Sequence, residues 1–382
     1  MRKALIVLLG TAVLLALAIG CTSTSAPSPT AAVPKTQASP TKAAVAPTAA
    51  AAPTAPAKGA AAATTKELAK VKLGVVTGIS DAAFFIANDK GYFKEQGLEV
   101  QMTPFNSAAQ MVAPLSIGQL DAGGGAPGAG LYNAMAREIT VKIVADKGSF
   151  GENDSYQALL VRKDLVDSGK FKDYKDLKGL KIAIPAEGIT PHVELDAALK
   201  KGGLTLKDAD TVVMPFPEMP AAFAGKSIDA AVSIEPFSTL AVQKGVAVKF
   251  KGSNEYYPNH QVAVVLYSPA FIKDRPDVAK RFMVAYLKAA RDYNDAFVKK
   301  DKKAWDDVVG ILMKNTSVKD KALYEKMPMP GINPNGDVMI QSLKDDQEWY
   351  LAKGYQKTRI NIDSLVDQQF IKYAVQQLGV YK

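Results

Sequence analysis

Cysteine and histidine are almost absent from this sequence of 382 residues. It contains one cysteine, Cys21, and two histidines, His192 and His260. A single cysteine excludes an internal disulfide, and the sequence has no cysteine pair, no His-x-x-x-His and no phosphate-binding glycine loop. We therefore expect no catalytic residue, no metal and no cofactor, and we interpret both histidines as structural.

Long apolar runs and clustered charge are also missing beyond the N-terminus. No second apolar run reaches the roughly 20 residues that span a bilayer. The formal net charge is +9, but lysines alternate with acids in mixed runs such as 170–181. The sequence has no basic helix and no base-stacking motif, so the charge predicts a solvated surface and no binding to nucleic acid.

The N-terminus has the pattern of an export signal. Met1-Arg-Lys is followed by the uncharged apolar run Ala4 to Gly20, which ends in small residues. The residues Leu-Ala-Ile-Gly before Cys21 resemble a bacterial lipobox, although lipoboxes usually carry leucine where this chain has Ala18. The resemblance implies that 1–21 is a lipoprotein signal peptide with lipidated Cys21. We expect an extracytoplasmic protein that a lipid anchor holds to the cell membrane; an uncleaved anchor or ordinary cleavage nearby is the alternative.

Residues 22–65 have a different composition. They are mainly Ala, Pro, Thr and Ser with three lysines, and they contain no aromatic residue, no Leu or Ile and no acid. Such a stretch buries too little apolar surface to offset the entropy of ordering, so we predict a disordered Ala/Pro/Thr-rich tether. A glycosylated or merely tolerated spacer is the alternative.

From residue 66 onward the pattern alternates between strands and helices, in two blocks. The first block predicts strands at 71–76, 98–102 and 141–145 and helices at 82–93, 108–115 and 129–137. The second predicts strands at 180–184, 212–214 and 229–234 and helices at 191–199 and 219–223. This order is typical of an α/β protein with parallel sheets.

Two apolar strands, 156–161 and 261–267, flank the second block symmetrically. We interpret them as two crossings between lobes, which makes 66–160 and 264–382 lobe I and 161–263 lobe II. A strong helix is predicted at 276–297 from its helical spacing of apolar residues. The remaining C-terminal region is helical in character, and we expect it to pack back on lobe I.

A family resemblance rests on two motifs. The run from Ala83 to Val100 contains Gly-Tyr-Phe-Lys-Glu-Gln-Gly, and Gly118-Gln-Leu-Asp follows it. Together they resemble the substrate-binding proteins of ABC transporters of the nitrate, sulfonate, taurine and thiamine-precursor class, whose relatives include riboflavin-binding lipoproteins. The resemblance covers roughly 73–293. It implies a type II periplasmic-binding-protein fold, with two α/β lobes, two hinge strands and a small-molecule ligand in the cleft. It also implies delivery to a permease powered by a separate ATPase, and we expect a monomer.

In open α/β sheets the ligand lies beyond the carboxyl ends of the strands. This rule selects loops in both lobes, and the ligand-binding residues that we predict in them are Thr77, Ser80, Asp81, Phe84, Asn106, Ser107, Gly124, Gly125, Asp146, Glu187, Thr190, Phe216, Glu218, Glu235 and Tyr256. Several have structural alternatives: Ser80, Asp81 and Thr190 as helix caps, Phe84 as core and Glu235 as a hinge residue.

The charges of these loops indicate a ligand class. The loops hold five carboxylates against one cation, Lys147, together with several aromatic and hydroxyl side chains. This favours a neutral or cationic aromatic heterocycle, such as riboflavin or a thiamine pyrimidine precursor. An alkanesulfonate, taurine or nitrate is the alternative ligand. An enzyme like those of pyrimidine synthesis, or a ligand sensor, is the alternative function.

Overall fold

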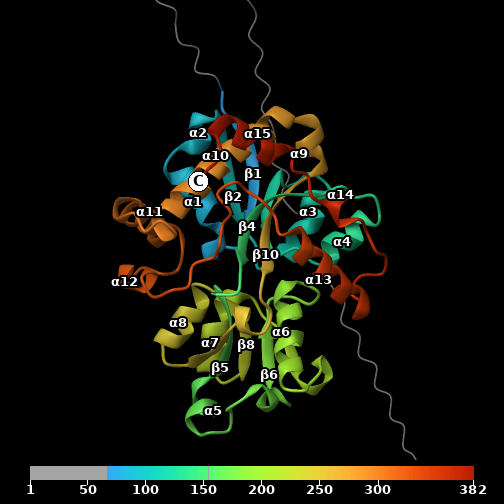
Figure 1. Cartoon of the computed structure of the whole chain (residues 1–382), viewed down its shortest axis with the longest axis vertical. Helices are drawn as coiled ribbons and strands as arrows, with labels where there is room; N and C mark the ends of the chain where they lie inside the picture. Colours follow the sequence, from blue (N-terminus) through green and yellow to red (C-terminus); the bar gives the residue numbers. More distant parts are fainter. Residues whose placement is uncertain (1–66, 154) are drawn as a thin grey trace, which may run out of the picture. The chain divides into compact units, whose positions relative to one another are not determined.

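The computed structural model describes residues 67–153 and 155–382 (Figure 1). The predicted signal peptide, Cys21 and the predicted tether lie outside these residues. No helix in the described ranges is long and apolar enough to cross a membrane.

The first of two five-stranded sheets has the order β2-β1-β3-β10-β4 (Figure 1). Its strands are β1 Ala69–Val75, β2 Leu98–Pro104, β3 Ala122–Gly125, β4 Lys142–Phe150 and β10 His260–Tyr267. Strand β1 is parallel to β2 and β3, whereas β10 is antiparallel to β3 and β4. The antiparallel strand β10 therefore lies inside this sheet, between β3 and the edge strand β4.

The second sheet repeats this arrangement in the order β7-β6-β8-β5-β9. Its strands are β5 Gln157–Arg162, β6 Lys181–Ile184, β7 Asp210–Val213, β8 Ala230–Ile234 and β9 Ala247–Gly252. Strand β6 is parallel to β7 and β8, and β5 is antiparallel to β8 and β9. Two blocks with similar strand and helix order have thus folded into two sheets of the same topology.

The chain changes sheet twice. It passes from β4 to β5 across residues 151–156 and returns from β9 to β10 across 253–259. The two predicted crossing strands are thus the antiparallel strands β5 and β10, each lying wholly in the sheet that the chain enters. Both changes of sheet come a few residues before the predicted lobe boundaries at 160/161 and 263/264, which stay a prediction of where compact units divide.

Helices surround both sheets. Those associated with the first half of the chain and the first sheet are η1 Ile79–Asp81, α1 Ala82–Asp89, α2 Tyr92–Glu95, η2 Ala108–Met111, α3 Val112–Ser116 and α4 Ala129–Met135. Those of the second block are α5 Lys163–Asp167, η3 Tyr174–Leu177, α6 Thr190–Lys201, η4 Leu206–Asp208, η5 Phe216–Glu218, α7 Met219–Ala224, α8 Phe237–Gln243 and η6 Ser253–Glu255. The C-terminal helices are α9 Pro269–Asp274, α10 Pro276–Phe297, α11 Lys302–Asn315, α12 Lys321–Tyr324, α13 Ile340–Ala352, α14 Ile362–Leu365 and α15 Gln369–Leu378.

One predicted helix is split. The segment predicted as a helix over 82–93 becomes α1 and α2, because Gly91 has a left-handed φ of 77° that ends one helix and begins the next. Helix α10 has the predicted bounds. Its first residue is proline, whose fixed φ suits the first turn, and its buried face packs against α1, α11 and α15.

Helix α13 reaches further than expected. It contacts α4 and β10 of the first lobe and also α6 of the second (Figure 1). Tyr132 Oη donates to the carbonyl of Leu343 at the start of α13, and Tyr350 Oη donates to the carbonyl of Pro127. The C-terminal region therefore packs on lobe I, as predicted, and in addition bridges to lobe II.

Candidate functional site

A narrow cavity of about 40 Å³ lies between the two sheets, where the carboxyl ends of their parallel strands meet. Its lining comes from both lobes and from the crossing strands β5 and β10: Val76, Ser80, Ser107, Ala108, Gly125, Ala126, Lys147, Tyr156, Gln157, Pro185, Ile189, Thr190, Pro191, Phe216, Ile234, Val262 and Ala263. The position agrees with the rule for open α/β sheets.

The cavity brings together five of the fifteen predicted ligand-binding residues. These are Ser80, Ser107, Gly125, Thr190 and Phe216. The first three come from the first lobe and the last two from the second. Both walls of the cavity therefore contain predicted residues, whose binding of a ligand stays a prediction.

Three predicted residues are exposed and lie outside the lining, namely Asn106, Glu187 and Glu218. Phe84 belongs to the core, where its ring centroid lies 5.1 Å from that of Tyr286. Thr77 has a left-handed φ of 60° and donates its hydroxyl to the carbonyl of Val76. None of these five residues lines the cavity.

Three further predicted residues are buried but face other partners. Asp146 accepts hydrogen bonds from Gln261 Nε2 at 2.6 Å and from the backbone N–H of Asn333 at 2.6 Å. Burial raises the pKa of Asp146 to about 6. Glu235 accepts from the N–H of Thr239, and the Tyr256 hydroxyl pairs with Ser253 in the core of the second lobe.

Asp81 and Gly124 lie directly behind the lining and support it. Asp81 accepts from the N–H of Val76 and forms a buried ion pair with Lys147, with 2.8 Å between its Oδ1 and the lysine Nζ. A Cβ on Gly124 would lie 2.5 Å from Lys147 Cε and 2.6 Å from the Phe84 ring. The absent side chain of Gly124 therefore leaves room for the lysine stem.

Lys147 is a cavity residue that the sequence prediction did not select. Its side chain is 1% exposed, and its ammonium donates to Ser80 Oγ at 2.9 Å while pairing with Asp81. The sequence did contain a signal for Lys147, because it is the only cationic residue in the predicted loops. Lys147 is thus a cation at the cavity wall whose charge is balanced by Asp81.

Tyr156 and Gln157 also line the cavity without having been predicted. Both are buried, and the Tyr156 hydroxyl and both amide atoms of Gln157 have no hydrogen-bond partner within the described ranges. Burial raises the pKa of Tyr156 well above its usual value, so the phenol stays protonated. Buried polar groups without partners are rare in proteins. They stand out here because they line a cavity.

The electrostatics of the lining favour an electronegative group. Helix α6 begins at Thr190, and the positive end of its dipole lies at the wall. Its first turn offers few free donors, because Pro191 has no N–H and the N–H of His192 donates to the carbonyl of Ile189. Lys147 contributes a cation. None of the described residues of the lining is an acid. The cavity therefore offers hydrogen-bond donors and positive potential, with Asp81 behind Lys147 as the compensating charge.

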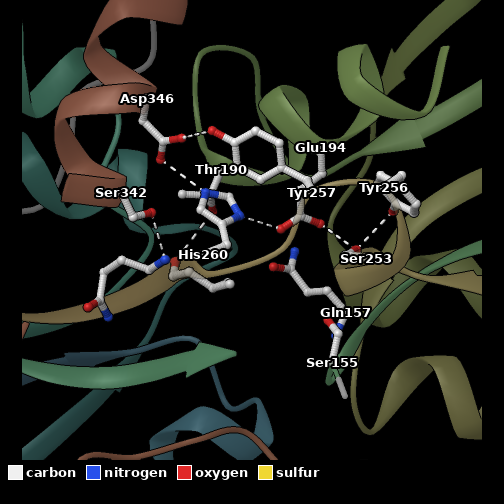
Figure 2. A network of polar contacts seen from close by, with 12 residues as sticks. Ser155, Gln157, Thr190, Glu194, Ser253, Tyr256, Tyr257, His260, Ser342 and Asp346 are labelled. Atoms are coloured by element: carbon white, nitrogen blue, oxygen red, sulfur yellow. Dashed lines mark hydrogen bonds and ion pairs between the residues drawn. The ribbon is translucent and has the colours of Figure 1, made fainter. Parts of the chain in front are cut away.

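A second polar cluster, seen in Figure 2, joins the lobes beside the cavity. His260, the first residue of β10, places Nδ1 2.8 Å from Glu194 of α6 and Nε2 3.1 Å from Asp346 of α13. Ser253 donates to Glu194 and Tyr257 donates to Asp346. Burial alone would lower the pKa of His260, but Asp346 and Glu194 raise it to about 10. The imidazole is therefore charged at neutral pH and joins three elements.

The described residues contain no group of His, Cys, Asp and Glu side chains that could hold a metal ion. In the buried cluster, Glu194 and Asp346 each contact one nitrogen of His260, so the arrangement serves ion pairing. Both histidines of the chain lie in buried, structured surroundings, His260 in this cluster and His192 beside Trp349.

Two α/β lobes of matching topology, with a cavity at the carboxyl ends of both sheets, define the fold of the periplasmic solute-binding proteins. The alkanesulfonate-binding protein SsuA of Xanthomonas axonopodis superposes with a TM-score of 0.63 over 80% of this chain and 100% of that protein, at 18% identity. The nitrate-binding protein NrtA of Synechocystis superposes with a TM-score of 0.66 over 82% and 90%, at 17% identity. At such identities the similarity shows the fold alone.

The chain belongs to the NMT1-like family, whose profile matches residues 64–304. A candidate binding protein of Brucella abortus is 30% identical over 55% of this chain and 62% of its own length. The taurine-binding periplasmic protein of Escherichia coli is 25% identical over 54% and 61%. One relative is an enzyme, the 4-amino-5-hydroxymethyl-2-methylpyrimidine phosphate synthase of Aspergillus parasiticus, with 26% identity over 56% and 62%. These matches confirm the predicted resemblance, and the chain spans about three fifths of the length of these relatives.

Proposed function

We propose that this protein is the extracytoplasmic solute-binding protein of an ABC importer. It captures a small molecule between its lobes and passes it to a membrane permease powered by a separate ATPase. The observation that carries the proposal is the cavity itself, which draws its lining from both lobes and from both crossing strands. Closing two lobes around a ligand is the standard way in which such an arrangement binds.

The ligand that we propose carries a small anionic oxygen group, as sulfonates and nitrate do. Lys147 supplies a cation and the hydroxyls of Ser80 and Ser107 supply donors that such a group prefers, while the N-terminus of α6 adds the positive end of a helix dipole. The expectation of a neutral or cationic aromatic heterocycle depended on five loop carboxylates, and these lie outside the lining. A cavity of about 40 Å³ is also far smaller than the roughly 300 Å³ or more of a typical drug-sized site.

Isothermal titration calorimetry on the purified protein tests this ligand class. Sulfonates and nitrate form one arm, and riboflavin and a thiamine pyrimidine precursor form the other. We expect saturable binding in the first arm only, with the anion recovered unchanged after incubation. Binding of a flavin or pyrimidine without binding of any anion would overturn the ligand class, and turnover of a bound compound would favour an enzyme.

We further propose that the mature protein is a monomer, anchored through a lipid on Cys21 and held off the membrane by the tether 22–65. The lone cysteine at the end of an apolar N-terminal run supports the anchor. Cell fractionation compares the wild-type protein with Cys21→Ala. We expect the variant to leave the membrane fraction, and a variant that stays membrane-bound would contradict lipid anchoring.

A further inference from the structure

The unpaired polar groups of the cavity form two separate sets. The Tyr156 hydroxyl lies on the side of Lys147 and Ser80, because a Cβ built on Gly148 would meet Tyr156 Oη at 2.7 Å and Ser80 Cβ at 3.1 Å. Tyr156 therefore extends the group of donors that we assign to the anionic oxygen.

Gln157 lies elsewhere. Figure 2 shows its side chain extending from the start of β5 toward the Glu194–His260 pair, on the side of the second lobe. The residue is fully buried and lines the cavity. In the part of the chain that the structure describes, neither Nε2 nor Oε1 has a hydrogen-bond partner. The residue thus brings to the cavity wall an NH2 group that can donate and a carbonyl oxygen that can accept, neither of them engaged.

We propose that Gln157 determines specificity by binding a second polar group of the ligand, so that the ligand is a short bifunctional molecule. It carries an anionic oxygen group for the Lys147 side and, at its other end, a group that can donate a hydrogen bond to the Gln157 carbonyl, such as an amine or a hydroxyl. This inference rests on the proposed function and narrows its ligand class.

Gln157 can select a ligand because leaving a buried polar group unpaired costs more free energy than a typical hydrogen bond gains. A buried amide that has lost its water and gained no partner destabilises the protein, and a ligand that pairs with it recovers this free energy on binding. An analogue without the second polar group leaves the amide unpaired and is rejected. Sites built in this way discriminate far better than apolar pockets, which tell ligands apart only by size.

The test uses three sulfonates of equal chain length: ethanesulfonate, 2-hydroxyethanesulfonate and 2-aminoethanesulfonate. Calorimetry on the full chain should show that at least one of the two bifunctional compounds binds more tightly than ethanesulfonate, by about tenfold or more. Gln157→Met keeps the side-chain length and removes both polar atoms. In this variant the preference should fall to within about threefold, because the hydrogen bonds are lost but the apolar contacts remain.

Ser233→Ala is the matched control. Ser233 also has a buried hydroxyl without a partner among the described residues, but it does not line the cavity. Its substitution should leave the preference among the three sulfonates unchanged. Equal binding of the three sulfonates to the wild-type protein, or a preference that Gln157→Met does not reduce, overturns the role of Gln157.

Thermal unfolding without ligand provides a second readout that does not depend on the ligand class. Gln157→Met should melt at the same temperature as the wild-type protein or higher, since it removes two unpaired polar atoms from the interior. A clear fall in melting temperature would mean that the amide is paired within the protein, and would overturn the inference. If none of the sulfonates binds, the proposed ligand class fails together with the specificity that depends on it, whereas the melting temperatures still show whether the Gln157 amide is paired within the protein.

Discussion

Replacing His260 by glutamine should destabilise the protein at neutral pH and remove an alkaline pH dependence. His260 is fully buried and lies between two carboxylates, with Nδ1 2.8 Å from Glu194 and Nε2 3.1 Å from Asp346. Glutamine is neutral and leaves both carboxylates without their cation. Breaking a buried ion pair from one side typically costs about 3–5 kcal/mol.

The pKa of His260 gives the same order of magnitude. Its rise from 6.5 to about 10 corresponds, at about 1.4 kcal/mol for each pKa unit, to roughly 5 kcal/mol. Burial also raises the pKa of Glu194, so part of this stabilisation offsets the cost of keeping that carboxylate ionised. We expect a net effect of roughly 3–5 kcal/mol.

The sign of the pH dependence follows from the direction of the shift. Because the pKa of His260 is higher in the folded than in the unfolded state, the stabilisation is complete below about pH 6.5 and is lost as pH rises toward about 10. Urea unfolding of the wild-type protein between pH 7 and pH 10 should show this decline. His260→Gln should be less stable at pH 7 and should approach the wild-type protein at the alkaline end.

His192→Gln is the control for this experiment, because His192 is the other histidine of the chain and burial lowers its pKa to about 4. It is already neutral at pH 7, so its substitution should leave the alkaline decline in place. A wild-type free energy of unfolding that is flat from pH 7 to pH 10, or an equal decline in His260→Gln, would refute the reasoning.

Three further substitutions test other parts of the site. Lys147→Met should abolish ligand binding in calorimetry. It should also lower the free energy of unfolding by about 3–5 kcal/mol, because it leaves Asp81 buried without its cation. Adding Asp81→Asn should restore most of the stability but not the binding. Gly124→Ala should weaken ligand binding and lower the free energy of unfolding in urea by about 1–3 kcal/mol, since its Cβ would lie 2.5 Å from Lys147 Cε. The control is Gly130→Ala in helix α4, where a Cβ meets no neighbouring atom within 4 Å, and it should be neutral or stabilising. On the acid side, the lowered pKa of His192 contributes stability that is complete above about pH 6.5 and is lost as pH falls toward about 4, so His192→Gln should reduce the acid sensitivity of unfolding.

The sequence pattern predicted the elements well where local signals agree. Helix α10 has a proline at its start and apolar residues at helical spacing, and its bounds were predicted without error. The two apolar strands predicted around the second block are β5 and β10, and the chain changes sheet in the segments just before them, 151–156 and 253–259. The helix predicted over 82–93 was wrong at one point, because Gly91 ends α1 through its backbone conformation rather than through its hydrophobicity.

The site was harder to predict because a loop's position does not fix the direction of its side chains. Asp146 and Lys147 are neighbours on β4, but successive side chains of a strand face opposite sides. Lys147 lines the cavity, whereas Asp146 faces Gln261 and Asn333. Tyr156 and Gln157 begin an apolar strand that resembles core in sequence. Counting charges by loop therefore assigned five carboxylates to the ligand, although they lie outside the lining.

Long-range partners were the second limit. Asp346 lies 86 residues beyond His260 in the chain, and the periodicity of α13 does not indicate which strand it covers. Only the folded arrangement shows that α13 supplies one carboxylate and α6 the other. A buried imidazole needs hydrogen-bond partners, but the sequence does not indicate which residues supply them.

The two polar clusters beside the crossings differ in how fully they are paired, and this difference indicates their roles. In the Glu194–His260–Asp346 cluster each charged group has a partner, and α13 is tied to α6 again where Trp349 and Lys353 both donate to Asp196. Paired groups of this kind hold α6, β10 and α13 in one arrangement next to the returning crossing. In the cavity, the Gln157 amide has no hydrogen-bond partner among the described residues. We therefore expect the free energy gained on ligand binding to come chiefly from the cavity groups, because the paired cluster has no such interaction left to gain.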